Sequence, residues 1–276
     1  MAAPSIPALS AHGAEIPAIG FGTSALGDCG EIVATALKLG YRHIDTAWKY
    51  GTERGVAQGM RASGVPRSEI FLTTKVSHEF LRADDFARSV DESLKNLGVD
   101  FVDLLLVHWP NPQIPLAETM GAMCKMKREG YTRHIGISNF TVQLIDEAVK
   151  LSSEPIVTNQ IEWHPYLDEE KVRAACKKHG IAVTAYCPIA RGRVPGNPVL
   201  ERIGAAHRKT AAQVSLRWLT QQGIIVIPGS GKPERQKENF AVLEFSLSPA
   251  EMNEIAKLKR PDGRVVNPPQ APKWDA

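Results

Sequence analysis

Eight short apolar runs rich in β-branched residues recur along the chain, and amphipathic stretches separate them. This alternation is typical of repeated βα units that build a parallel sheet. Eight units without a linker between them favour a closed α/β barrel, (β/α)8, over an open doubly wound sheet, which usually has fewer strands and a GxGxxG turn after one of them. No predicted strand is followed by that turn. The predicted strands are 18–22, 43–45, 70–75, 102–108, 134–138, 156–160, 182–186 and 224–227.

The stretch 84–97 shows a helical period. Its apolar residues are three and four positions apart, at Phe86, Val90, Leu94 and Leu97. One face of this helix is therefore apolar and is expected to pack on the sheet. The stretches 141–151, with Thr141 as N-cap, 210–221 and 248–258 repeat the design.

The two ends of the chain differ from this repeat. Residues 6–9 and 15–16 flank Ala11-His12-Gly13 and predict a small β-hairpin that plugs one end of the barrel. After Arg260, four prolines predict a C-terminal tail without regular structure. At 276 residues the chain suits one barrel, so we expect residues 1–276 to form a single domain.

Composition excludes several classes of protein. The net charge is +3 with acidic and basic residues intermingled, so no nucleic-acid partner is expected. No apolar stretch approaches the ~20 residues of a membrane span, and the N-terminus lacks a signal-peptide pattern, so we expect a cytoplasmic protein without membrane contact. The four Cys and eight His show no CxxC or HExxH spacing, so no metal site is expected. We also expect a monomer.

Polar or aromatic residues close most of the predicted strands. Reactive groups of such barrels lie at the C-terminal ends of the strands and in the loops that follow. Taken singly, each such residue could be a helix cap, a solvated charge or a hydrogen-bonded core residue. Together, buried Asp, Lys, His and Tyr must satisfy one another, so a shared network is expected. The residues are Asp45 with Tyr50 shortly after it, Lys75, His108, Ser138 with Asn139, Gln160 and Tyr186.

Longer motifs around these residues resemble the aldo-keto reductase family, including its bacterial 2,5-diketogluconate reductase-like members. The motifs in chain order are GYRHIDTAWKYGTE, IFLTTKV, LLLVHWP, HIGISNF, TNQIEWHPY, TAYCPIARG and VIPGSGKPERQKEN. The resemblance runs from about residue 14 to residue 259. It implies a (β/α)8 TIM barrel and an NAD(P)H-dependent oxidoreductase that reduces aldehydes or ketones to alcohols.

The resemblance assigns catalytic roles to Asp45, Tyr50, Lys75 and His108, which we call the tetrad. Tyr50 would act as general acid while the cofactor supplies hydride to the carbonyl carbon. A Tyr phenol with its ordinary pKa of ~10 donates a proton poorly at neutral pH, so we expect Lys75 to lower the pKa of Tyr50. Asp45 would keep the ammonium charged, and His108 would orient the carbonyl oxygen.

The resemblance implies NADPH as cofactor, with NADH as the alternative. Polar strand-end residues would bind the nicotinamide carboxamide, and Tyr186 would stack on the ring. Glycines and cations after the last strand would bind phosphate. The carboxamide set is Ser138, Asn139 and Gln160; the pyrophosphate path has Cys187, Ile189 and Gly192; the phosphate loop has Gly229, Ser230, Gly231, Lys232 and Arg235; and Glu238 with Asn239 would contact adenine.

The chain departs from the family pattern at several positions. Many members have Lys where Gly229 stands, so we expect a smaller preference for NADPH here and expect Gly229→Lys to add a phosphate contact. Many also have Asn at Thr52, and large aromatics at Ser24 and Ser77. The predicted substrate pocket for a small-molecule carbonyl comprises Ser24, Trp48, Ser77, His108 and Trp109.

Two other functions compete with this interpretation. A non-catalytic, cofactor-binding regulatory member of the same fold would have lost a tetrad residue or gained an interaction segment, and neither is seen. A barrel hydrolase or isomerase would require a metal cluster or paired carboxylates at strand ends. Only Asp45 is a convincing strand-end carboxylate, since Glu162 with His164 makes a weak pair.

Overall fold

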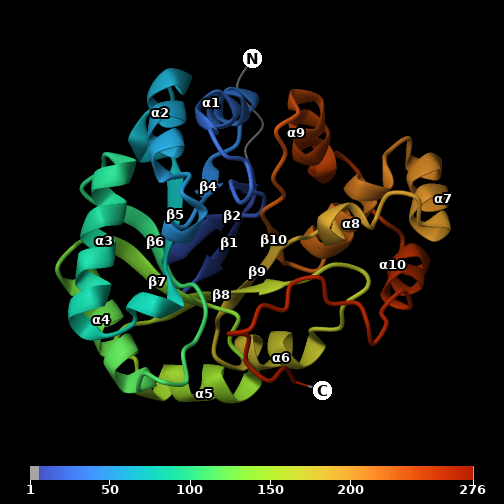
Figure 1. The fold of residues 1–276 in the computed structure, drawn as a ribbon. Coiled ribbons are helices and arrows are strands. Elements are labelled where there is room, and N and C mark those ends of the chain that lie inside the picture. Colours follow the sequence, from blue (N-terminus) through green and yellow to red (C-terminus); the bar gives the residue numbers. More distant parts are fainter. Residues whose placement is uncertain (1–5, 276) are drawn as a thin grey trace.

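Eight parallel strands form the centre of the molecule (Figure 1), in a computed structural model that describes residues 6–275. They are hydrogen-bonded in chain order, as β3 (Phe21–Gly22), β4 (His43–Asp45), β5 (Phe71–Val76), β6 (Val102–Val107), β7 (Thr132–Ser138), β8 (Ile156–Glu162), β9 (Ala182–Tyr186) and β10 (Ile225–Val226). The amide of Val226 donates to Ala18 O at 3.0 Å, and the amide of Gly20 donates to Val226 O at 2.8 Å. These bonds join the first strand segment to the last, so the sheet closes into the predicted barrel.

Helices surround the strands on the outside (Figure 1). They are α1 (Gly30–Leu39), α2 (Glu53–Ser63), α3 (Ala83–Leu97), α4 (Leu116–Arg128), α5 (Val142–Leu151), α6 (Glu170–Lys178), α7 (Pro198–His207), α8 (Ala211–Thr220), α9 (Pro233–Phe240) and α10 (Pro249–Ala256). Short 3-10 helices are η1 (Trp48–Tyr50), η2 (Arg67–Glu69), η3 (His78–Phe80), η4 (Ala190–Gly192) and η5 (Ala241–Glu244).

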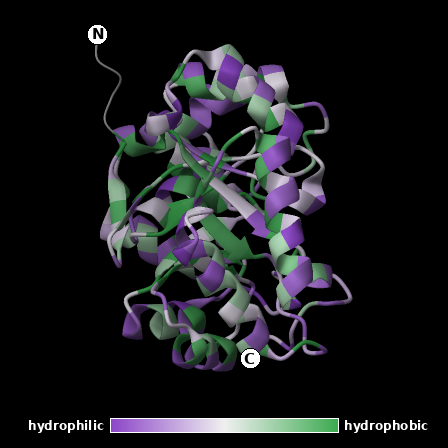
Figure 2. Ribbon diagram, turned by 90° about the vertical axis from the view of Figure 1, so that its left-hand side faces the viewer, coloured by the Kyte–Doolittle hydropathy of each residue, from purple (hydrophilic) through white to green (hydrophobic). Residues whose placement is uncertain are grey.

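The packing of α3 confirms its predicted apolar face. Phe86, Val90, Leu94 and Leu97 are all buried. The helix ends at Gly98, whose φ of 64° is the left-handed conformation that glycine adopts without strain. In Figure 2 the central strands are mostly hydrophobic, whereas the helices alternate between hydrophobic and hydrophilic residues. Within the described residues, no helix is long and apolar enough to cross a membrane.

The predicted N-terminal hairpin is present, as β1 (Ala8–Ala11) paired antiparallel with β2 (Ala14–Pro17). Its turn is His12-Gly13, both with positive φ, which matches the two-residue turn favoured in hairpins. The observed strands differ by one or two residues from the predicted ranges 6–9 and 15–16. Hairpin side chains pack with barrel-lining residues in one buried cluster that contains Ala14, Ile16, Leu104, Leu106 and Val157. The hairpin therefore closes one end of the barrel, as predicted.

Residues after α10 form no helix or strand up to residue 275, as predicted for the C-terminal tail. The tail runs across the molecule near α6 (Figure 1), and its backbone is hydrogen-bonded to Glu162 at the end of β8. It therefore lies on the same side of the barrel as the strand ends that bear the predicted site.

Candidate active site

A buried ion pair lies at the ends of two neighbouring strands, β4 and β5. Lys75 Nζ donates to Asp45 Oδ1 at 2.6 Å and to Thr46 O at 2.8 Å. Gln160 Nε2 donates to the other Asp45 oxygen at 2.8 Å. Burial alone disfavours the ammonium, but Asp45, Tyr50 and the bonds to them together raise the pKa of Lys75 above its ordinary value. Lys75 is therefore a permanent cation inside the barrel.

Tyr50 lies at the end of η1 with its ring against this cation. Lys75 Nζ is 5.0 Å from the centroid of the Tyr50 ring, and Tyr50 Oη is 3.4 Å from His108 Nε2. Burial raises the pKa of Tyr50, and the opposing effect of Lys75 is smaller. The expectation that Lys75 gives Tyr50 a lowered pKa is therefore wrong for the protein alone, because removal of the phenol from water outweighs the ammonium. Tyr50 is a protonated donor at neutral pH.

His108 follows β6 and is neutral at neutral pH. Burial, with a smaller contribution from Lys75, holds the pKa of His108 well below its ordinary value. Lys75 and Tyr50 therefore face an uncharged imidazole, which can hydrogen-bond an oxygen atom without adding a second positive charge.

We expect these ionisation states to give a flat pH profile around neutrality. His108 loses its proton well below its ordinary value of 6.5, and Tyr50 loses its proton above its ordinary value of 10.0. As pH rises through the pKa of Tyr50, activity falls because a phenolate cannot donate. Between about pH 7 and pH 9, kcat/KM for a carbonyl should therefore change by less than about twofold. An acidic limb near 6.5 that disappears in His108→Gln would contradict this account.

The predicted carboxamide set forms a second polar network beside the tetrad. Asn139, at φ 64°, donates through Nδ2 to His108 O at 2.8 Å and to Ser138 Oγ at 3.1 Å. Ser138 Oγ donates to Gln160 O at 2.8 Å, and Tyr186 Oη donates to Asn139 Oδ1 at 2.7 Å. Amide, hydroxyl and phenol groups thus converge, which fits a ligand that carries a primary amide and an aromatic ring.

The chain bends sharply after β9. Cys187, Ala190, Arg191 and Gly192 all have φ between 48° and 86°. Turns that contain left-handed residues recur at sites where backbone amides bind phosphate. Ile189 and Cys187 are half-buried and Gly192 is exposed, so the segment predicted as the pyrophosphate path lines the surface beside Tyr186.

Two backbone segments approach closely where Gly22 meets Gly229. A Cβ on Gly229 would lie 2.4 Å from Gly22 O, and a Cβ on Gly22 would lie 2.7 Å from Ile227 O. Both positions therefore require glycine unless the backbone shifts. The expectation that Gly229→Lys simply adds a phosphate contact is contradicted, because the lysine Cβ would collide with the neighbouring strand.

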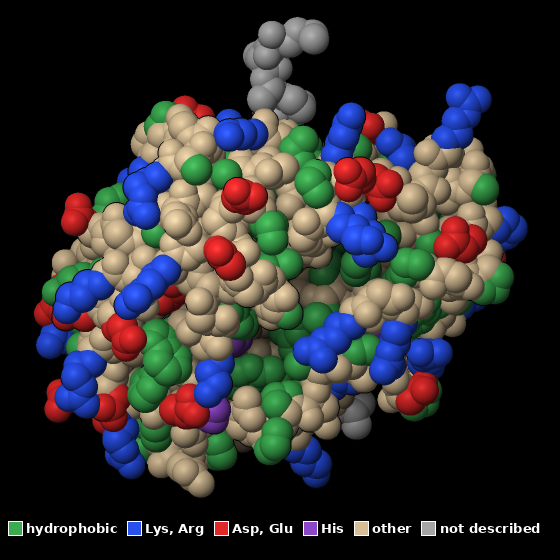
Figure 3. Space-filling model, turned by 45° about the horizontal axis from the view of Figure 1, so that its top comes forward, with side chains coloured by type: hydrophobic (Ala, Val, Ile, Leu, Met, Phe, Trp, Pro, Cys, Tyr) green, Lys and Arg blue, Asp and Glu red, His purple; other side chains and the backbone are tan. Residues whose placement is uncertain are grey.

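The loop that follows Gly229 is tied to α9. Gln236 Nε2 donates to Ser230 O at 2.9 Å, while Lys232 and Arg235 are exposed. Two free cations beside a fixed loop fit the predicted phosphate site. The other residues predicted here are Gly231 and Glu238, which are exposed, and Asn239, which is buried. One face of the molecule is hollowed, with hydrophobic side chains inside the hollow and Lys and Arg side chains near its edge (Figure 3).

The residues predicted for the substrate pocket occupy different environments. Trp48 is half-buried and packs edge-on against Phe80, whereas Ser24 is exposed. Ser77 is only 1% exposed and donates to Glu79 Oε2 at 2.9 Å, so its side chain is not exposed at the surface of the site. Trp109 is 7% exposed.

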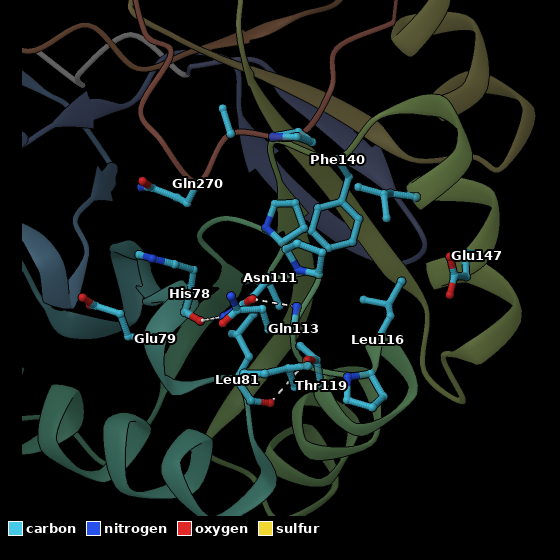
Figure 4. Close-up of a pocket in the computed structure, with 18 of the residues that line it drawn as sticks. His78, Glu79, Leu81, Asn111, Gln113, Leu116, Thr119, Phe140, Glu147 and Gln270 are labelled. Atoms are coloured by element: carbon cyan, nitrogen blue, oxygen red, sulfur yellow. Dashed lines mark hydrogen bonds between the residues drawn. The ribbon is translucent and has the colours of Figure 1, made fainter.

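A cavity of about 1210 Å³ opens among the loops at this end of the barrel, and none of Asp45, Tyr50, Lys75 and His108 lines it. Its walls come from the loops that follow Lys75 and His108, from α4 and α5, and from residues 269–273 of the tail. In Figure 4, Gln270 on the tail lies across this cavity from Leu116 and Thr119. Asn111 Nδ2 donates to His78 O at 2.9 Å. This bond joins the loop that follows Lys75 to the loop that follows His108 at the wall of the cavity.

Comparison with known proteins agrees with this geometry. The sequence profile of the aldo/keto reductase family matches residues 18–260. This chain belongs to the aldo-keto reductase family. Methylglyoxal reductase DkgB of Escherichia coli O157:H7 is 45% identical over 266 residues, covering 94% of this chain and 99% of that protein. Aldo-keto reductase Rv2971 of Mycobacterium tuberculosis (strain ATCC 25618 / H37Rv) is 40% identical over 271 residues, covering 96% of this chain and 94% of that protein.

Solved structures of other family members superpose closely on this aldo-keto reductase. A protein assigned as a 2,5-diketo-D-gluconic acid reductase B superposes with a TM-score of 0.96 at 48% identity, covering 99% of this chain and 98% of that one. The Bombyx mori aldo-keto reductase AKR2E4, solved in complex with NADP, superposes with a TM-score of 0.86 at 34% identity, covering 92% of both chains. The protein is therefore an NAD(P)H-dependent oxidoreductase that reduces carbonyl groups, as the motifs implied.

Some contacts of this reductase could not be foreseen from the motifs. The carbonyl of Thr46 binds Lys75, but a backbone group has no signature in sequence. Glu162 and His164 form a fully buried pair at 2.9 Å, which is more than the weak pair expected. Trp274 lies in the tail, 165 positions after its partner Trp109 by residue numbering, with ring centroids 6.0 Å apart. Among the described residues, no His, Cys, Asp and Glu cluster could hold a metal ion.

Proposed function

We propose that this reductase converts small aldehydes and ketones of the methylglyoxal class to alcohols, with Tyr50 as proton donor. The observation that carries the proposal is the position of Tyr50 between Lys75 and His108. The Lys75 ammonium is 5.0 Å from the Tyr50 ring centroid, and the Tyr50 hydroxyl is 3.4 Å from the His108 imidazole. A neutral donor, a neutral hydrogen-bonding ring and a fixed cation thus meet at one strand-end site.

Ser138, Asn139 and Gln160 would hold the nicotinamide carboxamide, and Tyr186 would cover one face of the ring. When bound, the cofactor supplies hydride to the carbonyl carbon. The side-chain network among these residues is compatible with that ligand because it contains both donors and acceptors, held in place by mutual hydrogen bonds. Preorganised partners reduce the ordering cost of binding.

Proton transfer would occur from Tyr50 Oη to the developing alkoxide oxygen. His108 would donate a hydrogen bond to the same oxygen and set its direction. Lys75, held by Asp45, would stabilise the negative charge that remains on Tyr50 after it donates. Since this interaction is stronger in the transition state than before it, the Lys75–Asp45 pair would accelerate the reaction and not merely bind substrate.

Two observations support a small carbonyl as substrate. The DkgB relatives are named methylglyoxal reductases, and one of them is 45% identical to this chain. Trp48, two positions before Tyr50, is half-buried, and Trp109, directly after His108, is 7% exposed, so both would present apolar surface to a bound substrate. Such walls suit a compact substrate with few hydroxyl groups.

We further propose that NADPH is preferred over NADH because Lys232 and Arg235 meet the 2′-phosphate. Each charge-assisted contact contributes about 1.5–3 kcal/mol. Arg235→Ala should therefore raise the KM for NADPH by about tenfold or more and leave the KM for NADH within about twofold. Michaelis constants for both cofactors, measured at fixed carbonyl concentration, test this expectation.

The matched control is Lys237→Ala on the same helix. Lys237 is exposed, and we assign it to the solvated face of α9. Its removal should leave both Michaelis constants nearly unchanged, and raised salt should weaken NADPH binding more than NADH binding. A lower KM for NADH than for NADPH in the wild type, with both constants unchanged in Arg235→Ala, would refute the assignment of this loop to the 2′-phosphate.

A further inference from the structure

Thr52 is a buried residue that has no part in the steps proposed so far, although it lies two positions after Tyr50 and directly before α2. It occupies the N-cap position of that helix but makes no capping side-chain bond. A Thr at this position ordinarily accepts a hydrogen bond from an amide of the first helical turn. The Thr52 hydroxyl is instead hydrogen-bonded to two residues outside the helix, so helix capping does not explain its placement.

Three buried threonine hydroxyls, those of Thr23, Thr46 and Thr52, are hydrogen-bonded in a row that we call the hydroxyl chain. Thr52 Oγ1 lies 3.0 Å from Thr23 Oγ1 and 2.9 Å from Thr46 Oγ1. Thr23 Oγ1 in turn donates to the carbonyl oxygen of Asp45 at 3.1 Å. The hydroxyl chain therefore ends on the backbone of a tetrad residue.

The number of available protons fixes the direction of the hydroxyl chain. A hydroxyl group donates one hydrogen bond and accepts up to two. Because Thr23 donates its proton to Asp45 O, the bond between Thr23 and Thr52 must be donated by Thr52. Thr52 then has no proton left, so Thr46 donates to Thr52. Without the Thr52 hydroxyl, Thr46 would keep a buried donor that has no other acceptor among residues 6–275, which is costly.

The bond between Thr46 and Thr52 closes the base of the loop that carries Tyr50. Residues 46–52 lead from the end of β4 through η1 to the start of α2. The two side chains at the ends of this loop are the ones joined at 2.9 Å. The Thr46 carbonyl also accepts from Lys75 Nζ at 2.8 Å. One hydroxyl contact thus ties the loop of the proposed proton donor to the residue that binds the ammonium.

We propose that Thr52 is a positioning residue, whose hydroxyl closes the loop of Tyr50 and so holds the phenol in place between Lys75 and His108. The part that concerns proton transfer rests on the proposed function. Thr52 contacts neither the carbonyl nor the cofactor and acts only through Tyr50. Its loss should therefore lower kcat while substrate and cofactor binding are retained.

Two backbone bonds inside the loop report whether it is closed. The amide of Tyr50 donates to Ala47 O at 3.0 Å, and the amide of Gly51 donates to Trp48 O at 3.1 Å. Hydrogen exchange at these two amides, measured on the apo protein, gives the frequency of loop opening without any turnover. In the wild type both amides should exchange at least about tenfold more slowly than in an unfolded chain.

Thr52→Val retains the shape of the side chain and removes only the hydroxyl. Exchange at the two amides should become about 3–10-fold faster, as expected for the loss of one buried hydrogen bond. Thr46→Val breaks the same bond from its other end and should give the same acceleration. Thr52→Ser keeps the hydroxyl and should exchange like the wild type.

Thr184→Val is the matched control, because it breaks another buried bond between threonines, the 2.9 Å contact of Thr184 with Thr158. It should leave exchange at the Tyr50 and Gly51 amides unchanged. An equal acceleration in this control, no acceleration in Thr52→Val, or unprotected amides in the wild type would overturn the closure of the loop by Thr52.

Kinetics with methylglyoxal separate a positioning role from a purely structural one. Thr52→Val should lower kcat by about 3–10-fold, because the donor is held less precisely, and leave the KM for NADPH and for methylglyoxal within about twofold. Thr52→Ser should recover at least about half of the wild-type kcat. In the Tyr50→Phe background, Thr52→Val should change kcat by less than about 1.5-fold, because no phenol remains to be positioned.

Two kinetic outcomes would refute the positioning role: an unchanged kcat in Thr52→Val, or the same fractional loss of kcat with and without the Tyr50 hydroxyl. The second outcome would mean that Thr52 only supports the fold. If the wild type reduced no carbonyl, the proposed function would fail, and hydrogen exchange would still decide whether Thr52 closes the loop.

Discussion

Tyr50→Phe is expected to fold normally, bind NADPH and lose nearly all carbonyl reduction. The substitution removes one hydroxyl whose partner, His108 Nε2, is at the long distance of 3.4 Å, so stability should change by less than about 1 kcal/mol. The same hydroxyl is the proposed proton donor. Its loss should lower kcat by about 10²–10⁴-fold, the range that general acid catalysis supplies. Steady-state kinetics with methylglyoxal, together with cofactor titration by fluorescence, measure the two effects.

Tyr186→Phe is the matched control because it removes another half-buried phenol of the same site. Tyr186 Oη donates to Asn139, so this variant should weaken cofactor binding modestly and retain substantial kcat. If Tyr50→Phe kept more than about a tenth of the wild-type kcat, Tyr50 would not be the general acid.

Lys75→Met is expected to be the most damaging single change in both stability and activity. It leaves the Asp45 carboxylate buried without its cation, which costs about 3–5 kcal/mol of folding free energy. It also removes the charge that would stabilise the Tyr50 phenolate, so kcat should fall by at least about 10²-fold. Urea denaturation and steady-state kinetics on the same preparation measure the two losses.

The double variant Lys75→Met/Asp45→Asn separates these two losses. Neutralising Asp45 removes the unpaired charge, so most of the lost stability should return. Activity should not return, because the cation is still missing. Recovery of activity in the double variant would show that Lys75 acts only by supporting the fold.

The barrel could be predicted from the sequence because its signal is repeated. Runs such as 102–108 are continuously apolar, and stretches such as 84–97 have one apolar face, so a buried strand and a covering helix were both indicated. The short strands were less well predicted: β10 has only two residues, which gives hydrophobic periodicity little to act on. The expectation that reactive groups lie at the C-terminal ends of the strands, together with the family motifs, then identified four residues that do lie near one another.

The remaining features depend on tertiary packing that no local pattern encodes. Burial, and not only the neighbouring Lys75, determines the direction in which the pKa of Tyr50 moves. The close approach of Gly229 to the carbonyl of Gly22, on the first strand of the barrel, joins residues far apart in the sequence. The C-terminal tail has no regular structure, and its contact with Glu162 spans more than a hundred positions. A proline-rich tail predicted only the absence of helix and strand, and not where the tail would bind.

The site around Tyr50 is proposed to catalyse NADPH-dependent carbonyl reduction. The most direct test follows NADPH absorbance and alcohol formation together after methylglyoxal is added to the purified wild-type protein. We expect NADPH to be consumed only in the presence of the carbonyl, in equal molar amount to the alcohol formed. Tight binding of NADPH without any carbonyl-dependent consumption would contradict it, and would instead indicate a cofactor-binding member of the family without catalytic activity.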